Sequence, residues 1–408
     1  MTFRSFVFSN ARWLAGGLNL TFFASFGQTF FIALFAGHLR SDFSLSHGQF
    51  GSLYMVSTLA SAITLVFIGK VVDRYSVRHV SMVVLMALAC ACVLMASAQN
   101  VVMLMVAIYL LRLAGQGMMT HTAVTAMGRW FVAERGRALA VTSAGHQFGE
   151  SCFPFLVFAL LTVLPWRVIW LLCAALLLLL SLPLTLRCFG LDRTPKGFSQ
   201  ARSEAGRQWT RQEAICDVWF WIACVGILAP GFIGTSVWFH QVHLLELKQW
   251  DTSVLVKGFV VMSLASVLVS LVSGQLVDRY SAHRLLPYTL LPLSAGCLLL
   301  AVASTPHAML AFMVLMGSCF GMYNAIFGAV WSEAYGTRHL GSIRSVVFAG
   351  MVLSSAVGPG LTGLLIDYGF GFESQLTFMA LAAFLVSLVQ VPVSIRLHSQ
   401  VIANRAEM

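Results

Sequence analysis

The sequence predicts an all-α membrane protein of twelve transmembrane helices, arranged as two pseudo-symmetric bundles of six. Two observations carry this prediction. Apolar residues make up 59% of the 408-residue chain and charged residues only 10%, whereas soluble domains carry about 25% charged residues. The stretch GKVVDRYSVRHV, which begins at Gly69, also recurs as GQLVDRYSAHRL from Gly274, an offset of 205 residues (274 minus 69).

Long uncharged runs predict the individual spans. No charged residue lies between Val80 and Leu111, and this run is too long for one span of about 20 residues. Polar residues interrupt it at Ser97–Asn100, so we read it as two helices joined by a tight turn. Applied along the chain, this reading predicts spans at about 13–38, 48–69, 79–98, 101–127, 137–162, 167–187, 217–243, 253–275, 285–303, 307–332, 341–366 and 374–395.

The distribution of basic residues predicts the orientation. Of the 25 Lys and Arg residues, all but Arg40, Arg112, Arg167, Lys248 and Lys257 fall at the termini or after even-numbered spans. This bias predicts that both termini are cytoplasmic. It also accounts for the net charge of +10, so nucleic-acid binding is not predicted. With its short outer loops and no evident cleavable signal peptide, the chain is expected to be a multi-pass protein of a bacterial inner membrane.

The repeat predicts the domain organisation. A six-span bundle over 1–187 is followed by a polar cytoplasmic linker over 188–216 and a second bundle over 217–408. Both halves begin on the same side, so they are related by an axis along the membrane normal. Halves of this kind usually enclose a binding site near the midplane.

The two duplicated loops carry a pattern of the form Gly-x-x-x-Asp-Arg-x-x-x-Arg/His that resembles the signature of the major facilitator superfamily. The resemblance covers the whole chain. It implies a secondary transporter that works by alternating access, binds a small-molecule solute and functions as a monomer. The matching residues are Gly69, Asp73, Arg74 and Arg78, and in the second copy Gly274, Asp278, Arg279 and His283.

The loop aspartates are expected to act as conformational latches. A loop Asp that lies near the cytoplasmic start of a helix in the other half meets the positive end of its dipole, which contributes about 0.3–2 kcal/mol. We expect Asp73 to meet the span that begins at 341, and Asp278 the span that begins at 137. The alternative is that the loops serve only as topological signals.

Ionisable residues inside spans are candidates for a functional site. Arg112 lies about 16 Å into the fourth span, and His146 about 14 Å into the fifth, at a rise of about 1.5 Å per residue. Glu150 follows His146 by one turn on the same helix face. We therefore predict a midplane cluster of Arg112, His146 and Glu150 that binds substrate or couples protons; a static ion pair between the two helices is the alternative.

Two further stretches resemble patterns of the superfamily and of one branch within it. RLAGQG, which begins at Arg112, is similar to a fourth-helix pattern of the superfamily whose Arg takes part in proton transfer or substrate binding. WFVAERGRALAVTSAG, which begins at Trp130, resembles the signature of monocarboxylate transporters and their bacterial oxalate/formate relatives. We add Lys257, Gln28 and Asn324 as candidate cavity or entry residues; snorkelling for Lys257 and polar packing for the others are the alternatives.

The sequence excludes several function classes. It shows no nucleotide-binding loop and no hydrolase or redox motif, so we expect neither an enzyme nor a cofactor. The His-x-x-His in HQVHLLE lacks further ligands, so no metal is expected. The leading hypothesis is a proton-coupled transporter of a small organic anion such as a monocarboxylate. A drug/proton antiporter that exports hydrophobic or cationic compounds, and a non-transporting receptor or assembly factor on the same fold, remain alternatives.

Overall fold

The computed structural model describes residues 3–69, 71–131, 135–190, 208–336 and 339–406. By its internal contacts the chain divides into two units, which are described separately. The first comprises Met1–Ser46 and Ser52–Gln200, and the second His47–Gly51 and Ala201–Met408. The helix that begins at His47 is described with the first unit, to which all but its first five residues belong. The predicted linker over 188–216 contains 191–207, which lie outside the described residues, so its boundaries stay a prediction.

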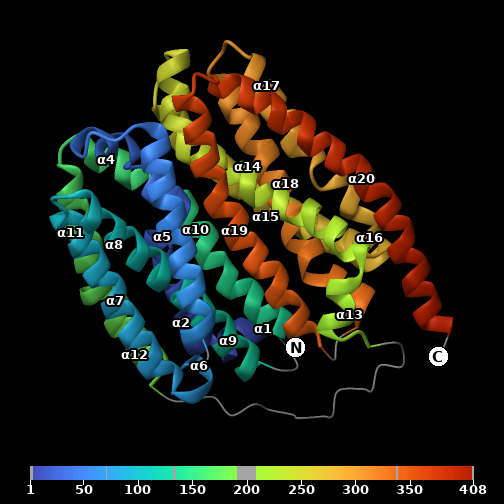
Figure 1. The fold of residues 1–408 in the computed structure, drawn as a ribbon. Coiled ribbons are helices and arrows are strands. Elements are labelled where there is room, and N and C mark those ends of the chain that lie inside the picture. The colour runs from blue at the N-terminus through green and yellow to red at the C-terminus, as the bar shows by residue number, and fades with distance from the viewer. Residues whose placement is uncertain (1–2, 70, 132–134, 191–207, 337–338, 407–408) are drawn as a thin grey trace. The chain divides into compact units, whose positions relative to one another are not determined.

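The first unit is built from long helices that are broken or distorted in three places (Figure 1). A 3₁₀ turn interrupts the first predicted span, and π-helical segments interrupt the fourth and the sixth. The elements are α1 (Phe3–Ser9), α2 (Ala11–Phe23), η1 (Ala24–Gly27), α3 (Thr29–Ala33), α4 (Ala36–Asp42), α5 (His47–Ile68), α6 (Val71–Arg74), α7 (Val77–Ser97), α8 (Val101–Leu111), η2 (Arg112–Met119), α9 (Thr120–Trp130), α10 (Arg135–Leu161), α11 (Trp166–Leu176), η3 (Leu177–Ser181) and α12 (Leu182–Cys188).

The second unit has longer, mostly uninterrupted helices. The short helix that precedes its first long helix begins at a capping box. The Thr210 hydroxyl accepts from the backbone N–H of Glu213, and the Glu213 carboxylate accepts from the backbone N–H of Thr210. The elements are α13 (Arg211–Cys216), α14 (Val218–Lys248), α15 (Ser253–Tyr280), α16 (Ala282–Leu285), η4 (Leu286–Tyr288), α17 (Leu291–Val302), α18 (His307–Tyr335), α19 (Leu340–Asp367) and α20 (Phe372–Ala406).

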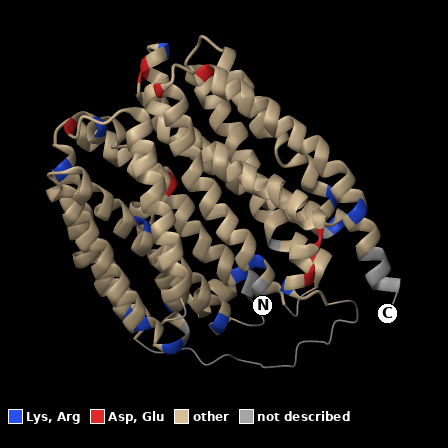
Figure 2. Ribbon diagram, in the orientation of Figure 1, with Lys and Arg blue, Asp and Glu red and all other residues tan. Residues whose placement is uncertain are grey.

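The helices confirm the predicted fold class. Within the described ranges, ten helices are long and apolar enough to cross a membrane. The segments Ala11–Ala33 and Ala36–Asp42, bent by 66°, make an eleventh candidate if they form one span. The 27-residue α10 (Arg135–Leu161) lies where the fifth span was predicted. Charged residues gather toward the helix ends in both units, as Figure 2 shows, which is the distribution that a lipid environment imposes.

A polar contact joins three helix ends at one end of the first unit. The guanidinium of Arg167, at the start of α11, pairs with the Asp42 carboxylate at the end of α4. It also donates to the carbonyl of Ala98, the residue after α7, at 3.2 Å, and its Cζ lies 4.4 Å from the ring centroid of Trp166. Trp166 Nε1 in turn donates to Asp42 at 3.1 Å.

The second unit carries the equivalent contact with the charges exchanged. Lys248 Nζ, at the end of α14, lies 2.6 Å from Glu373 Oε1 at the start of α20. It donates to Ala303 O at 2.8 Å. Ala303 corresponds in the repeat to Ala98 (98 plus 205), whose carbonyl accepts from Arg167 in the first unit. Here the cation is on the first helix of the unit and the acid on the last. Because the acidic and basic residues have changed places, an alignment of the two halves by residue type does not reveal this shared ion pair. Each pair is partly exposed, so its contribution to stability is small.

Candidate functional site

The first predicted span is broken where it meets the fourth. Gln28 is extended, at φ −83° and ψ 154°, which interrupts the helix between η1 and α3. A Cβ built at Gly27 would overlap the Leu111 carbonyl oxygen and would lie 2.7 Å from Gly115 Cα. The two backbones therefore approach too closely for any larger residue. Discontinuous helices of this kind are typical of transporter binding sites, and π-helical segments such as η2 often occur at functional sites.

Arg112, the first residue of η2, points into this break. Its side chain is 1% exposed. Nη1 donates to Gly27 O and to Thr29 Oγ1, each at 3.2 Å. The Tyr54 hydroxyl donates to the same Thr29 oxygen at 2.7 Å, and the Tyr54 ring centroid lies 5.4 Å from Arg112 Cζ. The guanidinium is thus held between α3, η1 and α5.

The charge of Arg112 is not neutralised by these contacts. Its partners are a carbonyl, a hydroxyl and an aromatic ring, all without formal charge. Nε and Nη2 have no hydrogen-bond partner among the described residues. An arginine side chain stays protonated in proteins, and burial of an ion without a counter-charge costs several kcal/mol. Among the described residues, Arg112 is therefore a buried cation whose hydrogen-bond partners carry no counter-charge.

Two of the predicted cluster residues lie together on α10. His146 Nε2 and Glu150 Oε1 are 4.0 Å apart, one helical turn from each other. The His146 ring is 6.2 Å from the ring of Phe30, which follows the Arg112 partner Thr29 in α3. Among the ion pairs of the described chain, none joins Arg112 to Glu150. The structure thus pairs His146 with Glu150, whereas the three-membered cluster stays a prediction.

The remaining candidate residues are dispersed. Gln28 is half-buried at the break itself. Lys257 is exposed near the start of α15 and Asn324 is exposed on α18. The hydroxyl and N–H of Ser253, and to a smaller extent Lys257, lower the pKa of Asp251 in the loop before α15. The charge of Lys257 therefore acts at the N-terminal end of α15. The role of Lys257 as an entry residue stays a prediction.

The latch residues are only partly described. The side chains of Asp73 and Asp278 lie outside the described residues, so their predicted meetings with other helices are untested. The loop around Asp73 is nevertheless held within its own unit. His121 Nε2 lies 3.1 Å from Gly69 O, and Arg129 donates to Val72 O at 3.1 Å.

Arg74, Arg78 and Arg279 are exposed, and Gly274 leaves open space where a Cβ would stand. Gly274 is therefore not required by tight packing in this structure. In the second copy, His283 is buried and contacts Glu333, a partner that the loop pattern gave no signal for. Tyr54 and Thr29 were likewise not separable from other polar span residues by sequence.

We expect Gly27→Ala to disturb the site. The added methyl must displace the η2 backbone, an overpacking that costs about 1–3 kcal/mol, and it should shift Arg112 as well. Thermal unfolding of the purified protein should show lower stability. Gly37→Ala is the matched control, since a Cβ there meets nothing within 4 Å. Equal stability of the two variants would contradict the close contact.

Comparisons with known proteins agree with this architecture. The sequence profile of the family described as Major Facilitator Superfamily matches residues 18–291 and 247–401. The chain resembles a bacterial homolog of the human lysosomal transporter Spinster, in an inward-facing and occupied conformation, with a TM-score of 0.67 and 14% identity over 100% of this chain and 98% of that one. It also resembles the nucleoside transporter NupG, with a TM-score of 0.68 and 13% identity over 93% and 98% of the two chains.

A shorter match joins the chain to curated relatives. It is 33% identical over 110 residues to a protein named Multidrug resistance protein B homolog, from two strains of Mycobacterium tuberculosis. The match covers 27% of this chain and 20% of the length of those relatives. The profile, by contrast, spans most of the sequence and agrees with the helical architecture. The chain therefore belongs to the Major Facilitator Superfamily, a family of multi-pass membrane transporters rather than of enzymes.

Proposed function

We propose that this transporter moves a small organic anion, such as a monocarboxylate, and couples its movement to protons by alternating access. The observation that carries the proposal is the buried guanidinium of Arg112 without a counter-charge. The proposal includes monomeric function in a bacterial inner membrane with both termini cytoplasmic, as the distribution of basic residues predicts.

The orientation of Arg112 favours a carboxylate. Nη1 is occupied by Gly27 and Thr29, whereas Nε and Nη2 are the nitrogens without a partner. These two nitrogens share one edge of the guanidinium. A carboxylate binds such an edge through two parallel hydrogen bonds, which gives both energy and geometric specificity. An anionic substrate would also supply the missing counter-charge.

His146 and Glu150 are proposed to carry the proton. Both groups change charge on protonation, and they lie beside the segment that holds Arg112. When the substrate anion is bound, a proton on this pair offsets its charge. The cost of moving charge through the low-dielectric part of the membrane falls accordingly. The proton held by His146 and Glu150 and the anion bound to Arg112 would then cross the membrane together, with no net charge transported.

A thermal-shift screen tests the proposal. The panel contains mono- and dicarboxylates, amino acids, sugars, nucleosides and lipophilic cations, each at about pH 6 and about pH 8. A ligand at 100 times its dissociation constant stabilises by about 2.7 kcal/mol. We expect carboxylates to stabilise the protein more strongly at the lower pH, and Arg112→Gln to remove the effect. The exposed Arg396 on α20 provides the control Arg396→Gln, which should respond as the unmodified protein does.

Export of hydrophobic or cationic drugs is the second candidate. The 33% identical segment shared with the Multidrug resistance protein B homolog favours it. In that case Glu150 would contact the cation and Arg112 would be a structural residue. Stabilisation by lipophilic cations alone, retained in Arg112→Gln and lost in Glu150→Gln, would support this candidate and contradict the first.

A further inference from the structure

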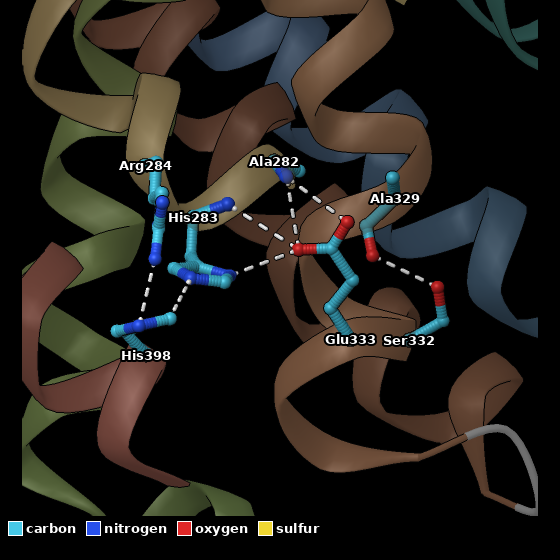
Figure 3. Close-up of polar contacts among 7 residues, drawn as sticks. All are labelled: Ala282, His283, Arg284, Ala329, Ser332, Glu333 and His398. Carbon is cyan, nitrogen blue, oxygen red and sulfur yellow. Dashed lines mark hydrogen bonds and ion pairs between the residues drawn. The ribbon is translucent and has the colours of Figure 1, made fainter. Parts of the chain in front are cut away.

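A chain of polar contacts closes the end of the second unit that carries the repeated Asp-Arg-Tyr-Ser loop (Figure 3). Glu333, near the end of α18, holds the turn that follows this loop. Its carboxylate accepts from Ala282 N at 2.9 Å and from His283 N at 3.4 Å. It also lies 3.1 Å from His283 Nδ1. His283 is 1% exposed, so the imidazole depends on these partners.

The contacts continue to the last helix. His283 Nε2 lies 3.2 Å from His398 Nδ1 on α20, and the two rings stack with centroids 5.3 Å apart. His398 Nε2 lies 2.8 Å from Nη2 of Arg284 on α16. The four side chains therefore run in the order Arg284, His398, His283, Glu333. They join α16, α18 and α20, and Figure 3 shows them pointing toward one another.

One set of protonation states satisfies the contacts that join these four side chains. Arg284 can only donate, so His398 Nε2 must accept and His398 must carry its proton on Nδ1. That proton is donated to His283 Nε2, which leaves the His283 proton on Nδ1, facing the Glu333 carboxylate. Both imidazoles are therefore neutral. A proton added to His398 would face Arg284, and a proton added to His283 would face His398.

The ionisable groups that face this chain from neighbouring elements include Glu333 of α18 and His398 of α20, which contact His283. From α15, the Arg279 guanidinium lies over the Tyr280 ring at 5.2 Å, and η4 contributes Tyr288, which is exposed.

We propose that Arg284, His398, His283 and Glu333 form a proton-sensitive clasp, closed when both histidines are neutral and opened by protonation of either one. Histidine is the side chain whose ordinary charge change falls between about pH 5 and 8, so acidification over that range is the perturbation that tests the clasp. Opening releases the last turns of α20 from α16. Because Glu333 also holds the turn after the Asp-Arg-Tyr-Ser loop, the same event loosens that loop. The clasp is separate from the proposed substrate site in the first unit and does not depend on which solute is carried.

Hydrogen exchange measured by mass spectrometry on the purified full-length protein tests the clasp. The readout is the protection of the amides in 394–400, at about pH 8 and about pH 5, corrected for the intrinsic pH dependence of exchange. We expect protection to fall about tenfold on acidification, the factor that corresponds to one charge-assisted hydrogen bond. Equal corrected protection at the two pH values would overturn the proposal.

Three variants separate titration from simple loss of packing. His398→Gln keeps an acceptor toward Arg284 and a donor toward His283 but cannot itself take up a proton. Protonation of His283 is then the one remaining way to open the clasp, so the loss of protection on acidification should be smaller than in the unmodified protein. His398→Arg imitates the protonated state and should show low protection at both. His307→Gln, an exposed histidine at the far end of α18, is the control and should respond to acid as the unmodified protein does. An acid response in His398→Gln as large as that of the unmodified protein would overturn the proposal, and so would full protection in His398→Arg.

Discussion

Arg112→Met is expected to abolish anion transport and, at the same time, to raise the thermal stability of the protein. The physical reason is that a buried cation without a counter-charge is costly in the absence of substrate, whereas methionine fills a similar volume without a charge. Replacement of buried ionic groups by apolar ones is often stabilising, by about 1–4 kcal/mol. The loss of the two hydrogen bonds from the guanidinium to Gly27 O and Thr29 Oγ1 offsets part of this gain.

The matched comparison is Arg167→Met at the start of α11. That guanidinium has a carboxylate partner and is 41% exposed, so its removal should leave stability unchanged or slightly lower and should leave transport intact. Melting curves of both variants in detergent, together with uptake into proteoliposomes, provide the measurement. If Arg112→Met retained transport, or lowered stability as the removal of a well-paired residue does, Arg112 would be a structural residue.

Glu150→Gln is expected to separate binding from proton coupling. Glutamine keeps the size and hydrogen-bonding capacity of the side chain but cannot take up a proton at neutral pH. Accumulation of the anion under an imposed pH gradient should therefore be lost. Exchange of labelled for unlabelled anion across the same membrane, which requires no net proton movement, should persist.

The control for this prediction is Glu246→Gln, since Glu246 is exposed near the end of α14 and should behave as the unmodified protein does in both assays. Loss of exchange as well as accumulation in Glu150→Gln would assign Glu150 to substrate binding. Unchanged accumulation would remove it from the coupling mechanism.

Much of the fold could be predicted because lipid imposes simple rules. Uncharged runs and polar interruptions located the helices, and the repeated loop predicted the superfamily. The distortions could not be predicted, since the extended backbone at Gln28 depends on the contact between Gly27 and Gly115, which are far apart in sequence. An isolated pattern of apolar residues favours a continuous helix at that point.

The ionisable residues of the candidate site could be predicted from the sequence, but the partners of Arg112 could not. Arg112 was visible as a charge within a span, and the spacing of His146 and Glu150 predicted their shared face. The partners of Arg112 are neutral groups from other helices, and such residues are common in every span. The clasp shows the same limit, because His283 and His398 lie 115 positions apart and only the folded chain brings them together.

The most direct test of the central claim is the uptake of a radiolabelled monocarboxylate by proteoliposomes that contain the purified protein, with an inwardly directed proton gradient. The account predicts accumulation above equilibrium, its collapse when a protonophore dissipates the gradient, and its absence in Arg112→Gln but not in Arg396→Gln. Accumulation that is unaffected by Arg112→Gln, or gradient-driven export of lipophilic cations with no movement of carboxylates, would contradict it.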